Sequence, residues 1–145
     1  MTVVVSGRCY CGKIRITATA PPVAVTYCHC DDCRRVTSAP VAAFAAFDIA
    51  SIAFTPDEGK SISKAPGVVR TFCDACGSTI AGHYDYLPDQ VYVGLGLLDQ
   101  ADDFAPQLHA HYENRMAWLD IQDDLPKSTG SARCQLNDKS QKPED

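Results

Sequence analysis

Cysteine dominates the residues of this chain that can do chemistry. Three thiols fall within the six-residue segment Cys28-His29-Cys30-Asp31-Asp32-Cys33. This spacing can place the three sulfurs on one face of a tight loop, one ligand short of a closed tetrahedral zinc site. Structural zinc usually has four protein ligands, whereas catalytic zinc keeps three and leaves a position open. The triplet formed by Cys28, Cys30 and Cys33 therefore predicts an open zinc site.

Two further cysteine pairs supply enough ligands for a second, closed site. The segments Cys9-Tyr10-Cys11-Gly12 and Cys73-Asp74-Ala75-Cys76-Gly77 are both pairs followed at once by glycine. In such a knuckle the backbone curls around a metal, and glycine supplies a conformation that other residues enter at a cost. The four cysteines predicted to hold a structural zinc ion are Cys9, Cys11, Cys73 and Cys76. A metal that joins the two pairs also closes a long loop.

The fourth ligand of the triplet is left open by the sequence. The protein candidates are His29, His83, His109, His111 and Cys134. His29 would have to reverse its direction to bind the ion held by its neighbours, and Cys134 lies in a polar tail. We expect an open position instead. Zinc with three thiolates is a weak Lewis acid that suits a soft ligand, so a substrate thiolate is the expected occupant.

Two arginines, Arg34 and Arg35, lie immediately beyond the triplet. Guanidinium groups recognise carboxylates through paired hydrogen bonds. A thiol that carries carboxylates, such as glutathione, fits both the open metal position and the arginines. We therefore expect Arg34 and Arg35 to bind substrate. The alternative for either arginine is an ordinary surface ion pair, which is common and weak.

Length and composition fit one globular domain. The chain has 145 residues, of which 46% are hydrophobic and 21% charged, so we expect a domain over residues 1–130 and a polar, mobile tail over 131–145. The net charge of −5 argues against a nucleic-acid partner. No apolar run approaches the roughly 20 residues of a membrane helix. The N-terminus lacks the features of a signal peptide, which predicts a cytoplasmic protein with reduced, metal-binding thiols rather than disulfides.

Short segments of alternating or β-branched residues, separated by turns, predict a mainly β fold of eight to ten strands with little helix. The one expected helical turn covers residues 31–37, with Asp31 or Asp32 as its N-cap. The segment 116–121 carries the single tryptophan, Trp118, which we expect in the core. The strand candidates are residues 3–5, 13–19, 23–27, 41–47, 49–54, 68–72, 78–84, 90–95 and 108–112.

The order of these motifs resembles the glutathione-dependent formaldehyde-activating family, which includes the centromere protein V domain. The resemblance covers about residues 5–127 and rests on Gly7-x-Cys9-x-Cys11-Gly12, Cys28-His29-Cys30-x-x-Cys33-Arg34-Arg35 and Phe72-Cys73-x-x-Cys76-Gly77. It implies a β-tent fold of short antiparallel strands with two zinc ions, one in the knuckles and one in the triplet. It also implies a carbon–sulfur lyase-type activity, the joining of formaldehyde to glutathione to give S-hydroxymethylglutathione.

Two other functions stay open on the sequence. In a non-catalytic binding module, a fourth side chain would close the triplet and zinc would serve only as a scaffold. In a thiol redox sensor, labile thiolates would oxidise and release the metal. The arginines beside an open site favour the enzyme over the binding module.

Overall fold

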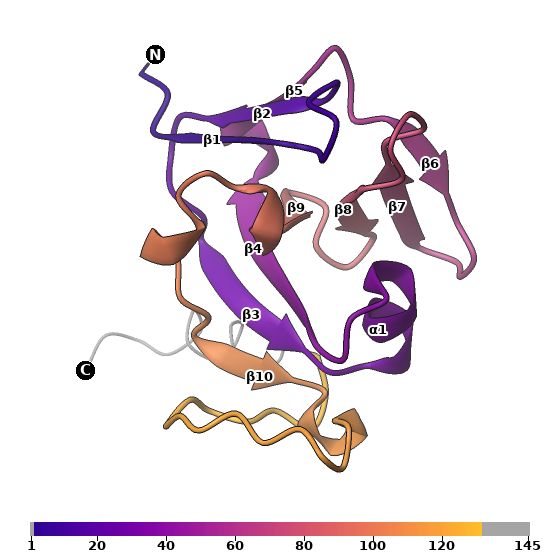
Figure 1. The fold of residues 1–145 in the computed structure, drawn as a ribbon, viewed down its shortest axis with the longest axis vertical. Coiled ribbons are helices and arrows are strands. Elements are labelled where there is room, and N and C mark those ends of the chain that lie inside the picture. The colour runs from indigo at the N-terminus through magenta and orange to yellow at the C-terminus, as the bar shows by residue number, and fades with distance from the viewer. Residues whose placement is uncertain (1, 132–145) are drawn as a thin grey trace. The chain divides into compact units, whose positions relative to one another are not determined.

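The chain contains two compact units, shown as a ribbon in Figure 1. The computed structural model describes residues 2–131. The first unit comprises Met1–Val25 and Phe44–Ala105, and the second comprises Thr26–Ala43 and Pro106–Asp145, as far as these segments are described. Apart from residue 131, the predicted tail lies outside the described residues, and so does Cys134. The single domain over residues 1–130 stays a prediction.

Strands account for 37% of the structure and helices for 15%, which confirms the predicted mainly β fold. Within the described part of the chain, no helix has the length and apolar character needed to cross a membrane.

The first unit is built from two sets of antiparallel strands. Alternation sets the register: in one strand Ile16 and Ala18 are buried while Arg15 is exposed. The smaller set is β1 (Val5–Arg8), β2 (Arg15–Ala18) and β5 (Ile52–Thr55). The larger set runs in the order β4 (Ala42–Asp48), β9 (Gln90–Gly94), β8 (Thr79–Tyr84), β7 (Val68–Phe72) and β6 (Lys60–Ile62). Short 3-10 turns are η1 (Ile49–Ser51), η2 (Leu95–Leu97) and η3 (Ala101–Asp103).

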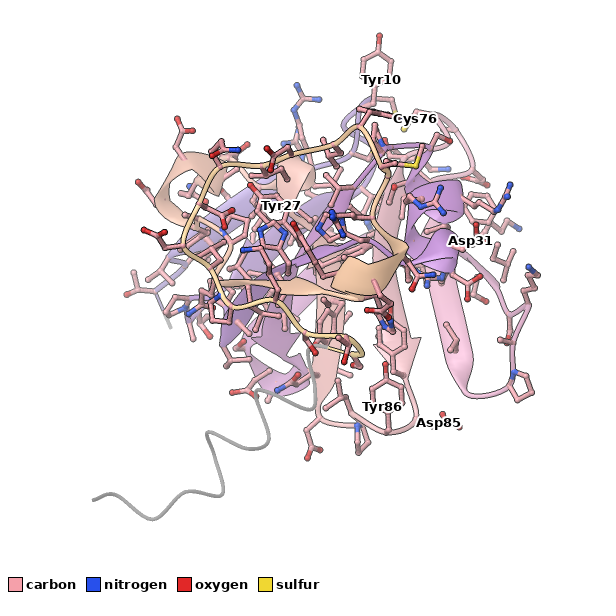
Figure 2. The ribbon with its side chains drawn as sticks, turned by 90° about the horizontal axis from the view of Figure 1, so that it is seen from below. Tyr10, Tyr27, Asp31, Cys76, Asp85 and Tyr86 are labelled. Carbon is pink, nitrogen blue, oxygen red and sulfur yellow. The ribbon has the colours of Figure 1, made fainter. Side chains whose placement is uncertain are left out.

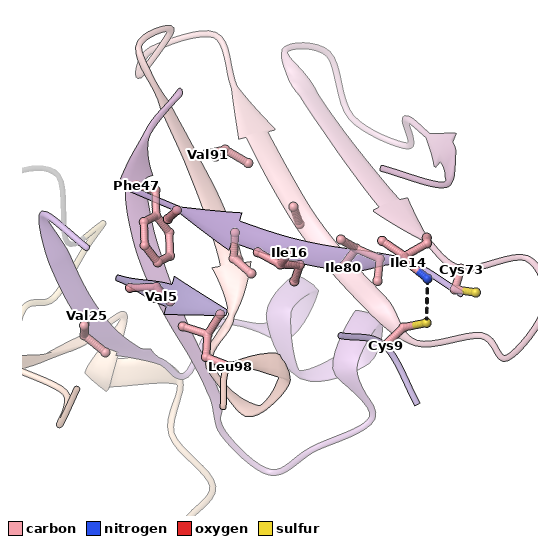
Figure 3. Close-up of a cluster of buried hydrophobic side chains, with 14 residues drawn as sticks. Val5, Cys9, Ile14, Ile16, Val25, Phe47, Cys73, Ile80, Val91 and Leu98 are labelled. Carbon is pink, nitrogen blue, oxygen red and sulfur yellow. Dashed lines mark hydrogen bonds between the residues drawn. The ribbon is translucent and has the colours of Figure 1, made fainter. Parts of the chain in front are cut away.

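The hydrophobic core of the first unit includes two of the predicted zinc ligands. Cys9 and Cys73 belong to the same buried cluster as Phe47 and Ile80, and are 1% and 0% exposed (Figure 3). The backbone N–H of Ile14, another core residue, donates to Cys9 Sγ at 3.4 Å. Apolar packing therefore helps to place two of the four thiols.

The second unit brings a strand end and a helix start together. Strand β3 (Ala24–Cys28) enters this unit and pairs in parallel with β10 (Leu108–Ala110). After two residues the chain forms helix α1 (Asp31–Thr37), which ends at Ser38 in a left-handed conformation. A 3-10 turn, η4 (Tyr112–Asn114), follows β10. The triplet therefore lies where β3 ends and α1 begins (Figure 1).

The structure corrects several of the expected elements. Only the second half of segment 49–54 is strand, because a 3-10 turn forms first. Strand β6 was not expected, and its three residues are all exposed, so it has no hydrophobic alternation to reveal it. Trp118 is 67% exposed, so its expected core position is wrong.

A glycine-to-alanine change tests the backbone that supports the second knuckle. Gly59 has φ of +95°, and a Cβ there would overlap the carbonyl oxygen of Phe72, the residue before Cys73. We expect Gly59→Ala to lower the free energy of unfolding by about 1–3 kcal/mol. Alanine is strained at this positive φ, and the added Cβ would force the backbone of Gly59 or Phe72 to move. Urea unfolding at fixed metal content would measure this loss.

The control for this change is Gly96→Ala, because a Cβ at Gly96 would meet nothing within 4 Å. We expect its unfolding free energy to stay within about 0.5 kcal/mol of the parent. Equal stability of the two variants would contradict the steric account of Gly59.

Candidate metal centres

Four cysteines of the first unit form a cluster that can hold a metal ion. The sulfurs of Cys9, Cys11, Cys73 and Cys76 all lie within 4.8 Å of one another. Cys9 Sγ is 3.7 Å from Cys11 Sγ, which is 3.9 Å from Cys73 Sγ. A tetrahedral zinc ion with Zn–S bonds of about 2.3 Å separates its sulfurs by about 3.8 Å. The cluster therefore has the size of a four-thiolate zinc site, formed from two segments far apart in the chain.

The two knuckles close in the same way. The Gly12 N–H donates to the Cys9 carbonyl at 3.1 Å, and the Gly77 N–H donates to the Cys73 carbonyl at 2.7 Å. Both glycines have positive φ, at 82° and 80°. That left-handed conformation is the one glycine adopts without steric cost, which explains why each pair is followed by glycine.

Polar contacts join the two knuckles at the surface. The Lys13 ammonium lies 2.9 Å from the Asp74 carboxylate, and this ion pair raises the pKa of Lys13 and lowers that of Asp74. The Ser78 hydroxyl accepts from the Tyr10 N–H at 3.0 Å and lies 3.3 Å from Cys76 Sγ. Tyr10 itself points away from the ribbon beside Cys76 (Figure 2).

The exposed thiol of Cys11 and the partly exposed thiol of Cys76 have opposite pKa shifts. Hydrogen bonds from the Ser78 hydroxyl and backbone lower the pKa of Cys76 to about 5. The pKa of Cys11 is raised to about 11, because burial and the neighbouring cysteines outweigh the opposing backbone hydrogen bond from Lys13. Without a cation, the cluster therefore carries its negative charge unevenly.

The three cysteines of the triplet also come together, in the second unit. The sulfurs of Cys28, Cys30 and Cys33 lie within 4.8 Å of one another, and Cys28 Sγ is 3.4 Å from Cys30 Sγ. Cys28 is the last residue of β3, and Cys33 lies in α1. Cys28 and Cys33 are buried, whereas Cys30 is partly exposed. The described cysteines of both clusters are free thiols.

Helix α1 begins at one of these cysteines. The expected N-cap was Asp31 or Asp32, but the cap is Cys30, whose sulfur accepts from the Cys33 N–H at 3.3 Å. Hydrogen bonds from the thiols of Cys28 and Cys33 hold the pKa of Cys30 far below its usual value. The pKa of Cys28 is raised by its own hydrogen bonds with Cys30 and Cys33 and by burial. A thiolate at Cys30 is further stabilised by the backbone N–H groups at the start of the helix.

Among the described residues, no fourth His, Cys, Asp or Glu ligand joins the triplet. His29 turns to His109 instead, at 2.8 Å between ring nitrogens, and His83 pairs with Glu58. His111 is not within ligand distance of all three sulfurs. The open position of the triplet stays a prediction that these contacts support.

His109 links His29 to a residue that sequence analysis did not single out. Its other ring nitrogen lies 2.9 Å from the Asp123 carboxylate, and this hydrogen bond lowers the pKa of Asp123. Burial, reinforced by His109, lowers the pKa of His29 to about 4. The expected strand over residues 108–112 is shorter in the structure, because β10 ends at Ala110 and His111 has φ of 52°.

The two arginines differ in their surroundings. Arg35 has a 75% exposed side chain and pairs through Nε with both oxygens of Asp31 at 3.0 Å. Arg34 is only 24% exposed, contacts Met116 Sδ and Asp31 at 3.4 Å each, and has a buried Nε without a partner. Asp31 projects from the start of α1 (Figure 2). Both arginines line an open cavity of about 500 Å³, together with Ser38, Ala39, Pro40 and Met116.

The fold and the two thiol clusters define a mainly β protein with two candidate metal centres. A sequence profile of the glutathione-dependent formaldehyde-activating enzyme family matches residues 4–114, a range that contains all seven clustered cysteines and both arginines. The chain belongs to this family.

Two similar proteins are consistent with this assignment. An uncharacterized lyase of Schizosaccharomyces pombe is 32% identical over 74 residues, or 51% of this chain and 53% of that protein. The chain thus spans about half the length of this curated relative. A crystal structure of a Rhodobacter sphaeroides protein superposes with a TM-score of 0.54 at 19% identity, covering 65% of this chain and 87% of that one. This likeness shows a shared fold.

Thiol reactivity in the metal-free chain tests the acidities of the four-cysteine cluster. We expect iodoacetamide at pH 7 to modify Cys76 before Cys11, although Cys11 is the more exposed, because only the thiolate is nucleophilic. Peptide mass spectrometry would give the order. Ser78→Ala should slow modification of Cys76 by removing a hydrogen bond to its thiolate. Faster labelling of Cys11, or no change in the variant, would contradict the assignment.

Proposed function

We propose that this protein is a zinc-dependent enzyme of the carbon–sulfur lyase type that joins glutathione to an aldehyde such as formaldehyde. Family membership supports the reaction class. The observation that carries the proposal is the triplet, three clustered thiols with no fourth ligand among the described residues and with Arg34 directly after Cys33. The proposed partner is a small carboxylate-bearing thiol and not a nucleic acid.

The donor sets suit two zinc ions, one in each cluster. All candidate ligands are cysteine sulfurs that lie within 4.8 Å of one another in their cluster, and soft sulfur ligands select zinc over magnesium or calcium. Cys9, Cys11, Cys73 and Cys76 would hold a structural ion, and Cys28, Cys30 and Cys33 the second one. A zinc ion bound by three thiolates offers an open position that accepts a further thiol and lowers its pKa.

The reaction needs a sulfur nucleophile and no redox partner. A carbon–sulfur bond forms between the glutathione sulfur and the aldehyde carbon, and the carbonyl oxygen gains a proton to become a hydroxyl. The thiol proton balances this gain, so nothing is oxidised or reduced. The contribution of the chain is to hold the thiol close to its electrophile, which lowers the barrier through proximity.

Arg34 is the better placed of the two arginines for a substrate carboxylate. Its Nε is buried without a partner, and it lines the open cavity next to the triplet's helix. A buried donor that lacks a partner gains a full hydrogen bond when an anion arrives. Arg35 already holds a carboxylate, that of Asp31, and lies in water, so it gains less.

Metal content tests the division between the two sites. We expect the purified protein to hold two zinc ions. Cys28→Ser should lose one ion and keep its fold, whereas Cys9→Ser should lose the other ion and unfold much of the domain, because Cys9 is part of the core. Atomic absorption and thermal unfolding would measure both effects. Identical behaviour of the two variants would contradict the division.

Glutathione binding tests the substrate. We expect glutathione to change the spectrum of a cobalt-substituted triplet and to form S-hydroxymethylglutathione with formaldehyde. Arg34→Ala should weaken glutathione binding by about tenfold or more, the value of a charge-assisted hydrogen bond. Arg35→Ala should weaken it less than about fivefold, as for an exposed ion pair.

The matched control for these variants is Arg15→Ala, an exposed arginine of the first unit, which should bind glutathione normally. A flat cobalt titration in the parent protein would instead favour a non-catalytic binding module. Unchanged affinity in both Arg34→Ala and Arg35→Ala would assign both arginines to the surface.

A further inference from the structure

Three polar side chains of the second unit form a continuous hydrogen-bonded network, which begins at His29 within the triplet segment. His29 Nε2 lies 2.8 Å from His109 Nδ1, and His109 Nε2 lies 2.9 Å from Asp123 Oδ2. Both imidazoles are only 1% exposed. Burying two imidazoles is unfavourable unless their nitrogens are paired, so these hydrogen bonds stabilise the two buried histidines.

When His109 is neutral, the carboxylate at one end fixes the direction of both hydrogen bonds. Ionised Asp123 only accepts, so His109 Nε2 must carry a proton and donate it. A neutral His109 then has its lone pair on Nδ1, which accepts from His29 Nε2. The remaining nitrogen of His29, Nδ1, is left with a lone pair, and it is a buried atom without a partner.

The imidazole of His29 is also held by its neighbours. Tyr27 stacks on His109 with ring centroids 4.8 Å apart, and Tyr112 packs edge-on against both histidines at 5.5 Å. The backbone N–H of His29 donates to the Ala110 carbonyl at 3.0 Å. The position of His29 is therefore determined on both its main chain and its side chain.

The segment that carries Asp123 is itself tied to the same strand. The N–H of His109 donates to the Pro126 carbonyl at 2.9 Å, and the Ser128 N–H donates to the His109 carbonyl at 2.8 Å. Asp123 Oδ1 accepts from the Leu125 N–H at 3.0 Å. The carboxylate thus reaches His109 from a fixed turn.

We propose that His109 and Asp123 are positioning residues of the triplet, acting through His29 to fix the turn that presents Cys28 and Cys30. These two cysteines are the direct neighbours of His29, so a rotation of its backbone would move both sulfurs. Metal–ligand distances tolerate shifts of only about 0.2 Å, so small movements of this turn reduce affinity. The inference rests on the proposed metal site and goes beyond it by assigning its support to residues far away in the sequence.

The first unit offers a matched control for the network. His83 Nε2 lies 2.7 Å from Glu58 Oε2, which also accepts from the Thr71 hydroxyl at 2.8 Å. This is the same imidazole–carboxylate pairing with no connection to a cysteine of the triplet. Removing either carboxylate costs one imidazole–carboxylate hydrogen bond, but only the removal of Asp123 should weaken metal binding at the triplet.

The test is zinc affinity in the full chain, measured by competition with a chromophoric chelator. We expect Asp123→Ala to weaken binding of the second zinc ion at least about tenfold, as loss of a supporting hydrogen bond does at other metal sites, and to leave the first ion unchanged. Asp123→Asn should restore much of the affinity, because an amide oxygen can still accept from His109. Glu58→Ala should bind both ions as the parent does.

Two results would overturn the proposal: parental second-site affinity in Asp123→Ala, or an equal loss in Glu58→Ala. A parent protein that binds only one zinc ion would overturn the proposed function as well, so the two failures are distinguishable. If Asp123→Ala fails to fold, the ring nitrogen shifts of His29 in the parent decide. We expect Nε2 to carry the proton and Nδ1 to lack one, and a proton on Nδ1 would refute the directed chain.

Discussion

The close approach of thiols is the constraint on which the rest of this structure depends. Each cluster holds its sulfurs within 4.8 Å of one another. Two unit charges at about 4 Å repel by about 4 kcal/mol at an effective dielectric constant of 20, so several thiolates cannot share such a site unaided. Either protons or a cation must offset the charge. The opposed pKa shifts of Cys76 and Cys11 are the consequence for the metal-free chain.

The two clusters meet this constraint with different supports. In the four-cysteine cluster, left-handed glycines close both turns, and Cys9 and Cys73 are anchored by the hydrophobic core. In the triplet, the sulfur of Cys30 caps the start of α1, and the ring of His29 is hydrogen-bonded to His109. The four-cysteine cluster joins two segments that lie far apart in the sequence. The triplet is a local turn whose geometry depends on distant residues, as expected of a site that must accept a ligand.

What could be predicted from the sequence follows the range of the interactions involved. The cysteine spacing and the flanking glycines are local, so both clusters and the limits of α1 were predicted correctly. The N-cap was assigned to Asp31 or Asp32 because aspartate is a preferred cap, although Cys30 has an acceptor in the right place. The link from His29 to Asp123 spans most of the chain, and no local pattern signals it.

The exposed tryptophan also shows that the local sequence does not predict long-range packing. Trp118 was expected in the core, but burial requires a partner surface, and its side chain is 67% exposed. The sequence analysis missed the edge strand β6 for the complementary reason. Its three residues are exposed, and only backbone pairing with β7 defines it.

Asp31 gives the proposed substrate site a competitor within the chain. Its carboxylate occupies Arg35 and touches Arg34, so an incoming carboxylate must share or displace it. Three thiolates around a divalent cation leave a net negative charge, which repels an anionic thiol unless positive charge lies nearby. The arginines supply that charge, and Asp31 offsets part of it. The balance between Asp31 and the two guanidinium groups therefore sets how strongly an anionic thiol is drawn to the triplet.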